Sequence, residues 1–445
     1  MSIAQLRRSI DFARVGAEMH EWMAALYPIC RSITGDGVRE TLALIKRQIP
    51  LTVHEVASGT KVFDWTVPKE WNIRDAFVAN ADGARVIDFR KSNLHVLNYS
   101  VPIKARMPLR DLKPHLFTLP EHPRWIPYRT SYYDERWGFC VSHEQMLGLD
   151  DGEYDVCIDS SLENGHLTYA ESWLEGDTRD EVLISCHVCH PSLANDNLSG
   201  IALVTFLARY LTGLRLRYSY RFLFVPGTIG SITWLYRNEP NVGRIRHGLV
   251  VACVGDAGRP TYKRSRRGNT EIDRVVTHVL RRSGSPYEIV DFSPYGYDER
   301  QFCSPGFDLP VGCLMRTPAG RFPEYHTSAD DLAFVHDGAL ADSLAKVLAV
   351  VEVLEGNRTY VNTNPRCEPQ LGKRGLYRAV GGAAEVGLDE LAMLWVLNLS
   401  DGTHTLLDIA ERSGQSFAAL EIAADALVRC GLLIEARGPD AGEGD

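Results

Sequence analysis

The stretch from Cys186 to Gly200, CHVCHPSLANDNLSG, concentrates residue types that bind metals or act as nucleophiles. It places two cysteines, two histidines and one aspartate close together in sequence. Three chemistries fit this composition: a structural zinc knuckle, a redox Cys-x-x-Cys pair, and the metal-binding strand end of a hydrolase. The surrounding sequence distinguishes between these three possibilities.

Cys186 and Cys189 stand at motif spacing, but their surroundings favour neither a knuckle nor a redox site. Structural zinc sites pair one Cys-x-x-Cys with a second Cys or His pair, and this chain has no second Cys-x-x-Cys. The preceding run, EVLIS, predicts a buried strand, on which residues three apart face opposite sides. A thioredoxin-like site needs a cysteine at a helix start, where Pro191 and Asn195 predict a loop. We expect most of the ten cysteines to be free, buried thiols.

The hydrolase interpretation accounts for more residues. His187 leaves the end of a predicted strand, and Asp196 lies just before a predicted helix. Strand ends and the loops after them are where α/β folds build their sites. Asp256 ends the apolar run LVVACVGD, and His326 lies in PEYHTSADDL ahead of another predicted helix. Because imidazole and carboxylate are the usual ligands of catalytic zinc, these four residues predict a metal site.

The elements that must position these residues are buried strands and helices. EVLISCHV, YRFLFVPG and HGLVVACVGD are short apolar runs typical of buried strands. NLSGIALVTFLARYLTGL has helical periodicity and a reasonable helix entry. Their alternation predicts an α/β fold with a mixed sheet flanked by helices.

Composition shifts along the chain predict several domains. Residues 1–57, of which 8–49 have helical periodicity, and residues 128–368 are assigned to the α/β domain. Residues 58–127 carry β-like runs and the hairpin signal ADGA, and predict an inserted small β-rich domain. Residues 369–387 are Gly-rich and linker-like. Residues 388–445 predict a winged-helix domain, because three helical patterns precede a short strand.

Size and charge limit the classes of function. The chain has 445 residues, 45% hydrophobic and 24% charged, which fits two or three globular domains. Its formal charge of −9 argues against a surface for nucleic acid or anionic membrane. No apolar run approaches the roughly 20 residues of a membrane span, and the N-terminus has no apolar signal core. We expect a cytoplasmic protein with a small-molecule or peptide substrate and no nucleic-acid or membrane partner.

The predicted winged helix is acidic. Its residues from Asp389 to Glu435 hold eight acids and two bases, Arg412 and Arg429. Phosphate contacts need Lys and Arg, so the domain is predicted to pack, dimerise or contact protein. A homo-oligomer is compatible with that role.

Several motifs occur in a specific order: SCHVCHPSLANDNLSG, VPGTIGSI, VGD, YKRSRRGNTEIDR, YDERQF, SPGFDLPVGCL and YHTSADDL. From Trp71 to the end, this layout resembles the co-catalytic zinc aminopeptidases. It resembles more closely a bacterial aminopeptidase-like family that combines a peptidase-like domain, an inserted β-domain and a C-terminal winged helix. The resemblance implies one or two zinc ions. His187 and Asp256 would bind one metal, Asp196 would bind or bridge, and His326 would bind a second metal or complete a single-metal site.

The sequence departs from the family pattern at two positions. Cys189 stands where the aminopeptidases place an aspartate that orients the first histidine, and His190 is a substitute as orienting donor or ligand. Gly227 stands where the nearer family has glutamate; the aminopeptidases use a glutamate pair there as base and ligand. Three explanations are open: a scaffold that binds without cleaving, Asp298 or Glu299 acting as base, or an inactivating substitution introduced for crystallography.

Two segments carry candidate substrate contacts. Arg264, Arg266 and Arg267 suit bidentate recognition of a carboxylate or phosphate; pairing with surface acids on a solvated loop is the equal alternative. Tyr297 and Arg300, in SPYGYDERQF, resemble the family's substrate-side loop.

The sequence therefore predicts a zinc-dependent aminopeptidase-like hydrolase acting on an aminoacyl amide or small peptide, with catalysis impaired at Gly227. In the active form, a carboxylate base takes a proton from water that the metal activates. The alternative is a non-catalytic, metal-containing protein that binds an aminoacyl or anionic small molecule. A third hypothesis is a transcriptional regulator, but the acidic recognition helix of the predicted winged-helix domain argues against it.

Overall fold

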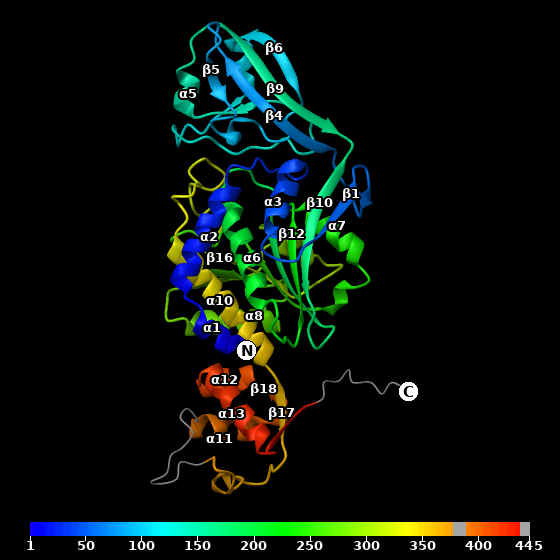
Figure 1. Ribbon diagram of the computed structural model, residues 1–445, viewed down its shortest axis with the longest axis vertical. Helices are drawn as coiled ribbons and strands as arrows, with labels where there is room; N and C mark the ends of the chain where they lie inside the picture. The colour runs from blue at the N-terminus through cyan, green and yellow to red at the C-terminus, as the bar shows by residue number, and fades with distance from the viewer. Residues whose placement is uncertain (377–388, 437–445) are drawn as a thin grey trace. The chain divides into compact units, whose positions relative to one another are not determined.

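The chain divides into two compact units (Figure 1). The computed structural model describes residues 1–376 and 389–436. The large unit is Ser9–Val347, and the C-terminal unit combines Met1–Arg8 with the described residues from Leu348 onward. All predicted metal ligands lie in the large unit. Across the described ranges, no helix has the length and apolar character needed to cross a membrane.

An eight-stranded mixed sheet forms the centre of the large unit, as the alternating pattern predicts. Its order is β1-β10-β12-β11-β13-β16-β14-β15. The strands are β1 (Thr52–Ala57), β10 (His166–Leu174), β11 (Glu181–His187), β12 (Ser219–Val225), β13 (Ile245–Val251), β14 (Thr261–Lys263), β15 (Glu288–Val290) and β16 (Val311–Met315). The four central strands β12, β11, β13 and β16 are parallel. Every residue of β11 is buried, which explains its unbroken apolar run.

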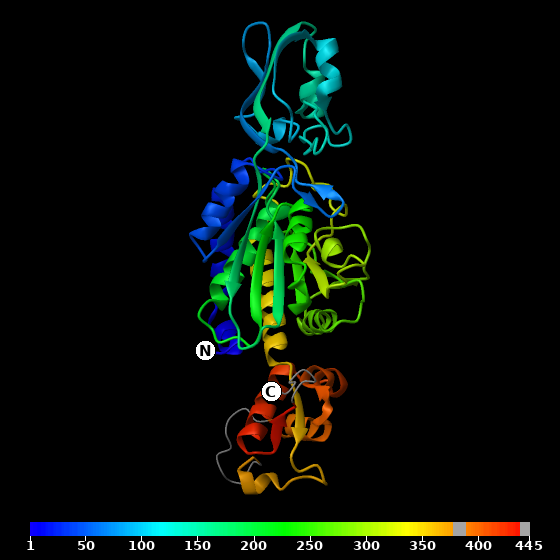
Figure 2. The same cartoon turned by 90° about the vertical axis from the view of Figure 1, so that its right-hand side faces the viewer.

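Helices cover both faces of this sheet, with the blue N-terminal helices on one side in Figure 2. The helices are α2 (Phe12–Leu26), α3 (Asp36–Lys46), α6 (Gly200–Leu211), α7 (Ile229–Asn238), α8 (Glu271–Arg282), α9 (Glu299–Phe302) and the first part of α10 (Asp337–Gly356). α6 packs against α2 and β11, and nearly all of its residues are buried. It is therefore a core helix, which holds the loop after β11 against the sheet.

The inserted domain is a four-stranded antiparallel sheet in the order β5-β4-β9-β6. Its strands are β4 (Glu70–Ala79), β5 (Arg85–Asp88), β6 (Ile103–Pro108) and β9 (Glu153–Glu163). It is accompanied by β7 (Leu116–Phe117), β8 (Phe139–Cys140), α4 (Leu109–Leu112) and α5 (His143–Leu147). The short hairpin of β2 (Lys61–Val62) and β3 (Trp65–Thr66) instead contacts α7 of the main domain. The expected hairpin joins β4 to β5 through Gly83, whose φ is 78°.

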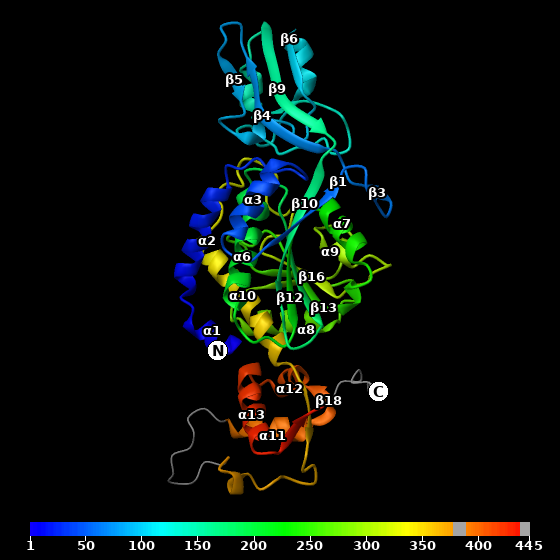
Figure 3. The same cartoon turned by 45° about the vertical axis from the view of Figure 1, so that its right-hand side comes forward.

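The boundary predicted at residue 127 is wrong. β9 pairs with β4 and β6 in the insert and then leads into β10 of the main sheet, as Figure 3 shows. The insert therefore extends to about Glu163. The prediction failed because β9 pairs with a strand about eighty residues earlier in the sequence, and such a partner leaves no local signal.

The C-terminal unit has the three helices and the strand that the sequence predicts. They are α11 (Glu390–Leu399), α12 (Leu406–Ser413), α13 (Phe417–Arg429) and β19 (Leu433–Glu435), with β17 (Thr359–Asn362) and β18 (Asp401–Thr405) beside them. β17 pairs with both β18 and β19, so this domain begins well before the predicted residue 388. Most of the predicted linker, residues 377–387, lies outside the described residues.

The N-terminal residues also depart from the predicted division. Residues 1–57 were assigned to the α/β domain, but Met1–Arg8 belong to the C-terminal unit. Arg7 of α1 (Ile3–Ser9) forms an ion pair with Glu352 of α10. This long-range pair explains the assignment, because the local helical pattern of α1 carries no information about its partner.

Candidate metal centre

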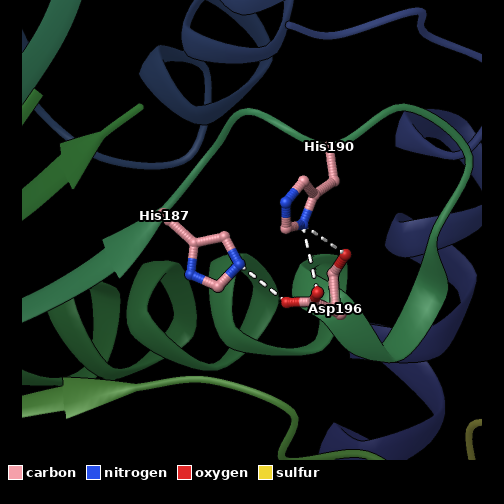
Figure 4. A group of neighbouring side chains, drawn as sticks. All are labelled: His187, His190 and Asp196. Carbon is pink, nitrogen blue, oxygen red and sulfur yellow. Dashed lines mark hydrogen bonds and ion pairs between the residues drawn. The ribbon is translucent and has the colours of Figure 1, made fainter. Parts of the chain in front are cut away.

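His187, His190 and Asp196 form a group whose possible ligand atoms all lie within 4.8 Å of one another (Figure 4). His187 ends β11, His190 lies in the following loop, and Asp196 lies before α6. His187 Nε2 is 2.7 Å from Asp196 Oδ1, and His190 Nδ1 is 3.2 Å from Asp196 Oδ2. The Asp196 carboxylate is fully buried.

His326 approaches the same carboxylate from the loop between β16 and α10. Its Nε2 lies 2.9 Å from Asp196 Oδ2, and its ring contacts the ring of His190. Its φ is 57°, a conformation that costs energy for a non-glycine residue and clusters at functional sites. The structure thus brings together the predicted His187, Asp196 and His326, and adds His190 as a third imidazole.

A polar network around Asn195 and Asn197 fixes this loop. Asn197 Nδ2 donates to the carbonyls of His187 and Val251, while Asn197 Oδ1 accepts from the amide of Cys253. Asn195 Oδ1 accepts from the amide of Gly255. These bonds join the ends of β11 and β13, so the histidine and the carboxylate are held on a rigid frame.

Asp330 supports the site but was not predicted. Its buried carboxylate accepts hydrogen bonds from the backbone amides of Asn195 and Asp196, at 2.5 and 3.0 Å. Burial raises the pKa of Asp330 to about 7. Its one sequence signal was the position of an acid four residues after His326, in YHTSADDL.

The electrostatics of the group follow from one buried negative charge among several imidazoles. Burial alone would raise the pKa of Asp196, but His190 and His187 hold it well below its usual value. Burial alone would lower the pKa of His190, but the charge of Asp196 holds it well above. Burial lowers the pKa of His326. A buried carboxylate surrounded by nitrogen donors is a suitable place for a divalent cation.

The donor set fits zinc. Three imidazoles and one carboxylate are ligand types of catalytic zinc sites. Among the described residues, no cysteine belongs to this group. His187 Nδ1 is buried and has no hydrogen-bond partner among the described atoms. Zinc-bound histidines usually donate through their second nitrogen, and here the expected orienting carboxylate is replaced by Cys189.

Asp256 does not join this group. β13 ends at Val251, five residues before Asp256. Asp256 Oδ1 accepts from the Thr317 hydroxyl and the Gly258 amide, and Oδ2 accepts from Asn195 Nδ2. Its oxygens therefore secure neighbouring loops. The prediction treated the whole run LVVACVGD as one strand, which displaced the strand end to the wrong residue.

Gly227 lies next to His187 and Asp298. A Cβ atom added there would lie 3.3 Å from His187 Cβ and 3.5 Å from Asp298 Oδ2. Asp298 is buried, and its Oδ1 accepts from the Ser231 hydroxyl at 2.7 Å. Its Oδ2 has no partner among the described atoms, and burial raises the pKa of Asp298. A carboxylate thus stands next to Gly227, the position at which the resemblance predicts a glutamate.

The neighbours of Asp298 have different surroundings. Glu299 is fully buried; its Oε1 forms a 2.7 Å ion pair with Lys263, and its Oε2 has no hydrogen-bond partner among the described atoms. Tyr297 stacks on the ring of His187 at a centroid distance of 5.2 Å, and its hydroxyl lies 3.0 Å from Cys253 Sγ. The Nε atom of Arg300 is buried without a partner among the described atoms. Tyr297 and Asp298 are therefore the two residues of this loop that adjoin His187.

The arginine cluster forms surface ion pairs. Arg264 pairs with Asp291, whereas Arg266 and Arg267 both pair with Asp308. These pairs match the solvated-loop alternative, and the structure does not bring the three guanidinium groups to the metal group.

The cysteines are free. All ten are unpaired, and both Cys186 and Cys189 are buried. Cys189 Sγ donates to the Gly227 carbonyl at 3.7 Å, and neither thiol belongs to the candidate ligand group. Six of the ten cysteines are buried, as predicted for most of them.

The fold is similar to proteins of known structure. A crystal structure of a Clostridium acetobutylicum protein matches with a TM-score of 0.93 and 53% identity, covering 98% of this chain and 100% of that one. The zinc aminopeptidase BSAP of Bacillus subtilis matches with a TM-score of 0.56 and 14% identity, covering 76% and 94% of the two chains. The second match shows an aminopeptidase-like fold.

The sequence comparisons match the whole chain to one relative and its two parts to two family models. A Clostridium acetobutylicum protein named "Putative polysaccharide biosynthesis protein with aminopeptidase-like domain" is 55% identical over 421 residues, covering 95% of this chain and 97% of that protein. Residues 358–435 match a winged helix-turn-helix family. Residues 20–357, which hold the whole metal group, match the domain of unknown function DUF4910, and the chain belongs to that family.

Proposed function

We propose that the protein is a zinc-dependent, aminopeptidase-like hydrolase of an aminoacyl amide or small peptide. The observation that supports this most strongly is the convergence of His187, His190 and His326 on the buried carboxylate of Asp196. Zinc bound there would polarise a carbonyl and lower the pKa of water. The aminopeptidase-like fold supports the same reaction class.

The chain's own residues would position the reactants and move the proton. His187, His190, Asp196 and His326 would hold the cation, and Asp330 would keep the loop in place through two backbone amides. Asp298 is our candidate base, because its unpartnered Oδ2 lies beside His187 and Gly227. Its raised pKa moves it toward the range in which a general base works best at neutral pH.

The competing proposal is a binding protein that does not cleave. Gly227 supports it, because general-base catalysis typically contributes roughly 100- to 10,000-fold. The Clostridium relative's name mentions polysaccharide biosynthesis, so a small amide conjugate carrying a sugar is a second class of ligand to assay beside aminoacyl amides.

The experiment is a hydrolysis assay of the purified full chain, with zinc added, against a panel of aminoacyl amides and dipeptides. We expect turnover that disappears in His187→Ala and persists in His166→Ala, where the exposed histidine lies at the start of β10. Binding of substrate or product without turnover would replace the hydrolase proposal by the binding-protein proposal.

A further inference from the structure

A cavity of about 490 Å³ adjoins the metal group. His190 and His326 line one part of it, and the segment from Tyr128 to Arg136 lines another. Its walls therefore include two of the predicted zinc ligands. A substrate whose scissile bond reaches the metal group can place its remaining atoms in this cavity.

The wall of the cavity carries more positive than negative charge. Arg129 and Arg136 line it, and Asp134 is the one acid among its described lining residues. Arg136 forms an ion pair with Asp134. No ion pair or side-chain hydrogen bond of Arg129 is found within the described parts of the chain; its guanidinium carbon lies 5.9 Å from the centroid of the Phe117 ring, which also lines the cavity. This local excess contrasts with a chain whose formal charge is −9.

The backbone that carries Arg129 is fixed to the metal group. The amide of Tyr128, the preceding residue, donates to the carbonyl of His326 at 2.8 Å. The Tyr128 ring contacts the rings of His190 and His326, each at a centroid distance of 5.2 Å. The Cα atom of Arg129 is therefore about 3.8 Å from that of Tyr128, whose ring contacts two proposed zinc ligands.

A second set of hydrogen bonds holds the rest of the segment. The amide of Asn98 donates to the carbonyl of Arg129, and the amide of Ser131 donates to the carbonyl of Asn98, both at 2.9 Å. The amide of Val101 donates to the carbonyl of Arg136 at 2.9 Å. Both arginines are therefore presented by backbone that is bonded to the same stretch, residues 98–101, and the site is organised before a ligand arrives.

We propose that this cavity selects substrates bearing an anionic oxygen group, with Arg129 as its direct partner. A guanidinium donates two parallel hydrogen bonds to a carboxylate or a phosphate. The tyrosine hydroxyls of Tyr128 and Tyr132, 2.8 Å apart, are further hydrogen-bonding groups of the same cavity. This inference rests on the proposed function, because it names the substrate class of that site as acidic aminoacyl or phosphate-bearing conjugates.

Calorimetric titration of the full chain tests the proposal without requiring turnover. The two arms use matched pairs: L-glutamate against L-glutamine for a carboxylate, and O-phospho-L-serine against L-serine for a phosphate. We expect one anionic member to bind at least tenfold more tightly than its neutral partner. Arg129→Gln should weaken binding of that anionic member about 10- to 100-fold, as expected for a lost charge-assisted hydrogen bond, and so remove most of the preference. Arg129→Lys should retain part of it.

Arg110→Gln is the matched control, since Arg110 lies on α4 with its side chain 84% exposed and outside the cavity. Equal binding of both members in both pairs would overturn the inference, as would an anion preference that survives Arg129→Gln. Anion binding lost in Arg129→Gln, in a protein that hydrolyses no amide, would uphold the inference and contradict only the proposed hydrolysis. Efficient turnover of neutral aminoacyl amides without an anion preference would uphold the proposed hydrolysis and contradict this inference.

Discussion

At the scale of residues, the account depends on how a few side chains around Asp196 are used. Spacing, together with the family resemblance, predicts His187, Asp196 and His326 as site residues, because each stands beside a predicted strand end or helix start. These arguments left open whether His190 orients the first histidine or binds metal, and they did not identify Asp330 as a support of the loop. Their roles depend on how the loop folds back over Asp196, and no local periodicity encodes that path.

Asp298 is predicted to act as the base. Asp298→Asn keeps the size of the side chain and an acceptor for Ser231, but removes the negative charge. We therefore expect hydrolysis to fall roughly 100- to 10,000-fold, measured as kcat at saturating substrate, with zinc content unchanged. Asp291→Asn, at an exposed acid that pairs with Arg264, is the control.

The neighbouring glycine allows a rescue experiment. Because a Cβ at position 227 would lie 3.5 Å from Asp298 Oδ2, Gly227→Glu introduces its carboxylate beside that group. In the Asp298→Asn background it should restore part of the lost activity, whereas Gly227→Gln should not. Full activity in Asp298→Asn alone would show that another group is the base.

At the scale of elements, the apolar runs were sufficient to predict the central strands and α6, since burial on both faces leaves an unbroken apolar pattern. They were insufficient for β9 and β17, whose partners are distant in sequence. Asp256 was misplaced for a related reason: apolar residues continue past the end of β13, so the pattern did not show where hydrogen bonding to the neighbouring strands stops.

One ion pair links α3 to the insert, and its pH dependence is predictable. Arg39 donates two hydrogen bonds to Glu70 of β4, at 2.7 and 2.6 Å, and lowers the pKa of Glu70 to about 2. The folded pKa is below the unfolded value of about 4.5. The stabilisation is therefore complete above about pH 4.5 and is lost as the pH falls toward 2.

Glu70→Gln should lower the free energy of unfolding at pH 7 by about 1 to 2 kcal/mol, measured by urea denaturation of the full chain. Glu163→Gln, at the exposed position that pairs with Glu70 across the sheet, should change it much less. A Glu70→Gln variant as stable as the wild type at pH 7 would contradict this assignment.

The C-terminal unit contains a carboxylate with the opposite behaviour. Burial raises the pKa of Glu421, on α13, to about 7; the charges of Glu352 and Asp425 add to the effect, while Arg358 and Arg8 oppose it. Because the folded pKa exceeds the unfolded value of about 4.5, stability declines as the pH rises between these values. The ionised form is therefore destabilising above pH 7.

Glu421→Gln should raise the thermal unfolding temperature of this unit at pH 8.5 and leave it nearly unchanged at pH 4.5. The expected gain is on the order of 1 kcal/mol. Glu411→Gln, at an exposed position of α12, is the control. An equal shift at both pH values would show that the carboxylate does not titrate as described.

At the scale of the whole molecule, a mixed α/β unit with an inserted β-sheet is joined in sequence to a small winged-helix domain. The sequence pattern and the resemblance were enough to predict this architecture, since each part has its own periodicity. They were not enough to predict the division of the N-terminal residues, because Arg7 pairs with a residue about 345 positions away. The acidic composition of the winged helix remains the basis for predicting a protein contact there.

The central claim is that the His187, His190, Asp196 and His326 group binds zinc. The most direct test is elemental analysis of the purified full chain alongside His187→Ala, His326→Ala and the control His166→Ala. We predict about one zinc ion or more per chain in the wild type and in His166→Ala, and a loss of zinc in the other two variants. A well-folded wild-type protein that binds no zinc, even after incubation with the metal, would contradict the account.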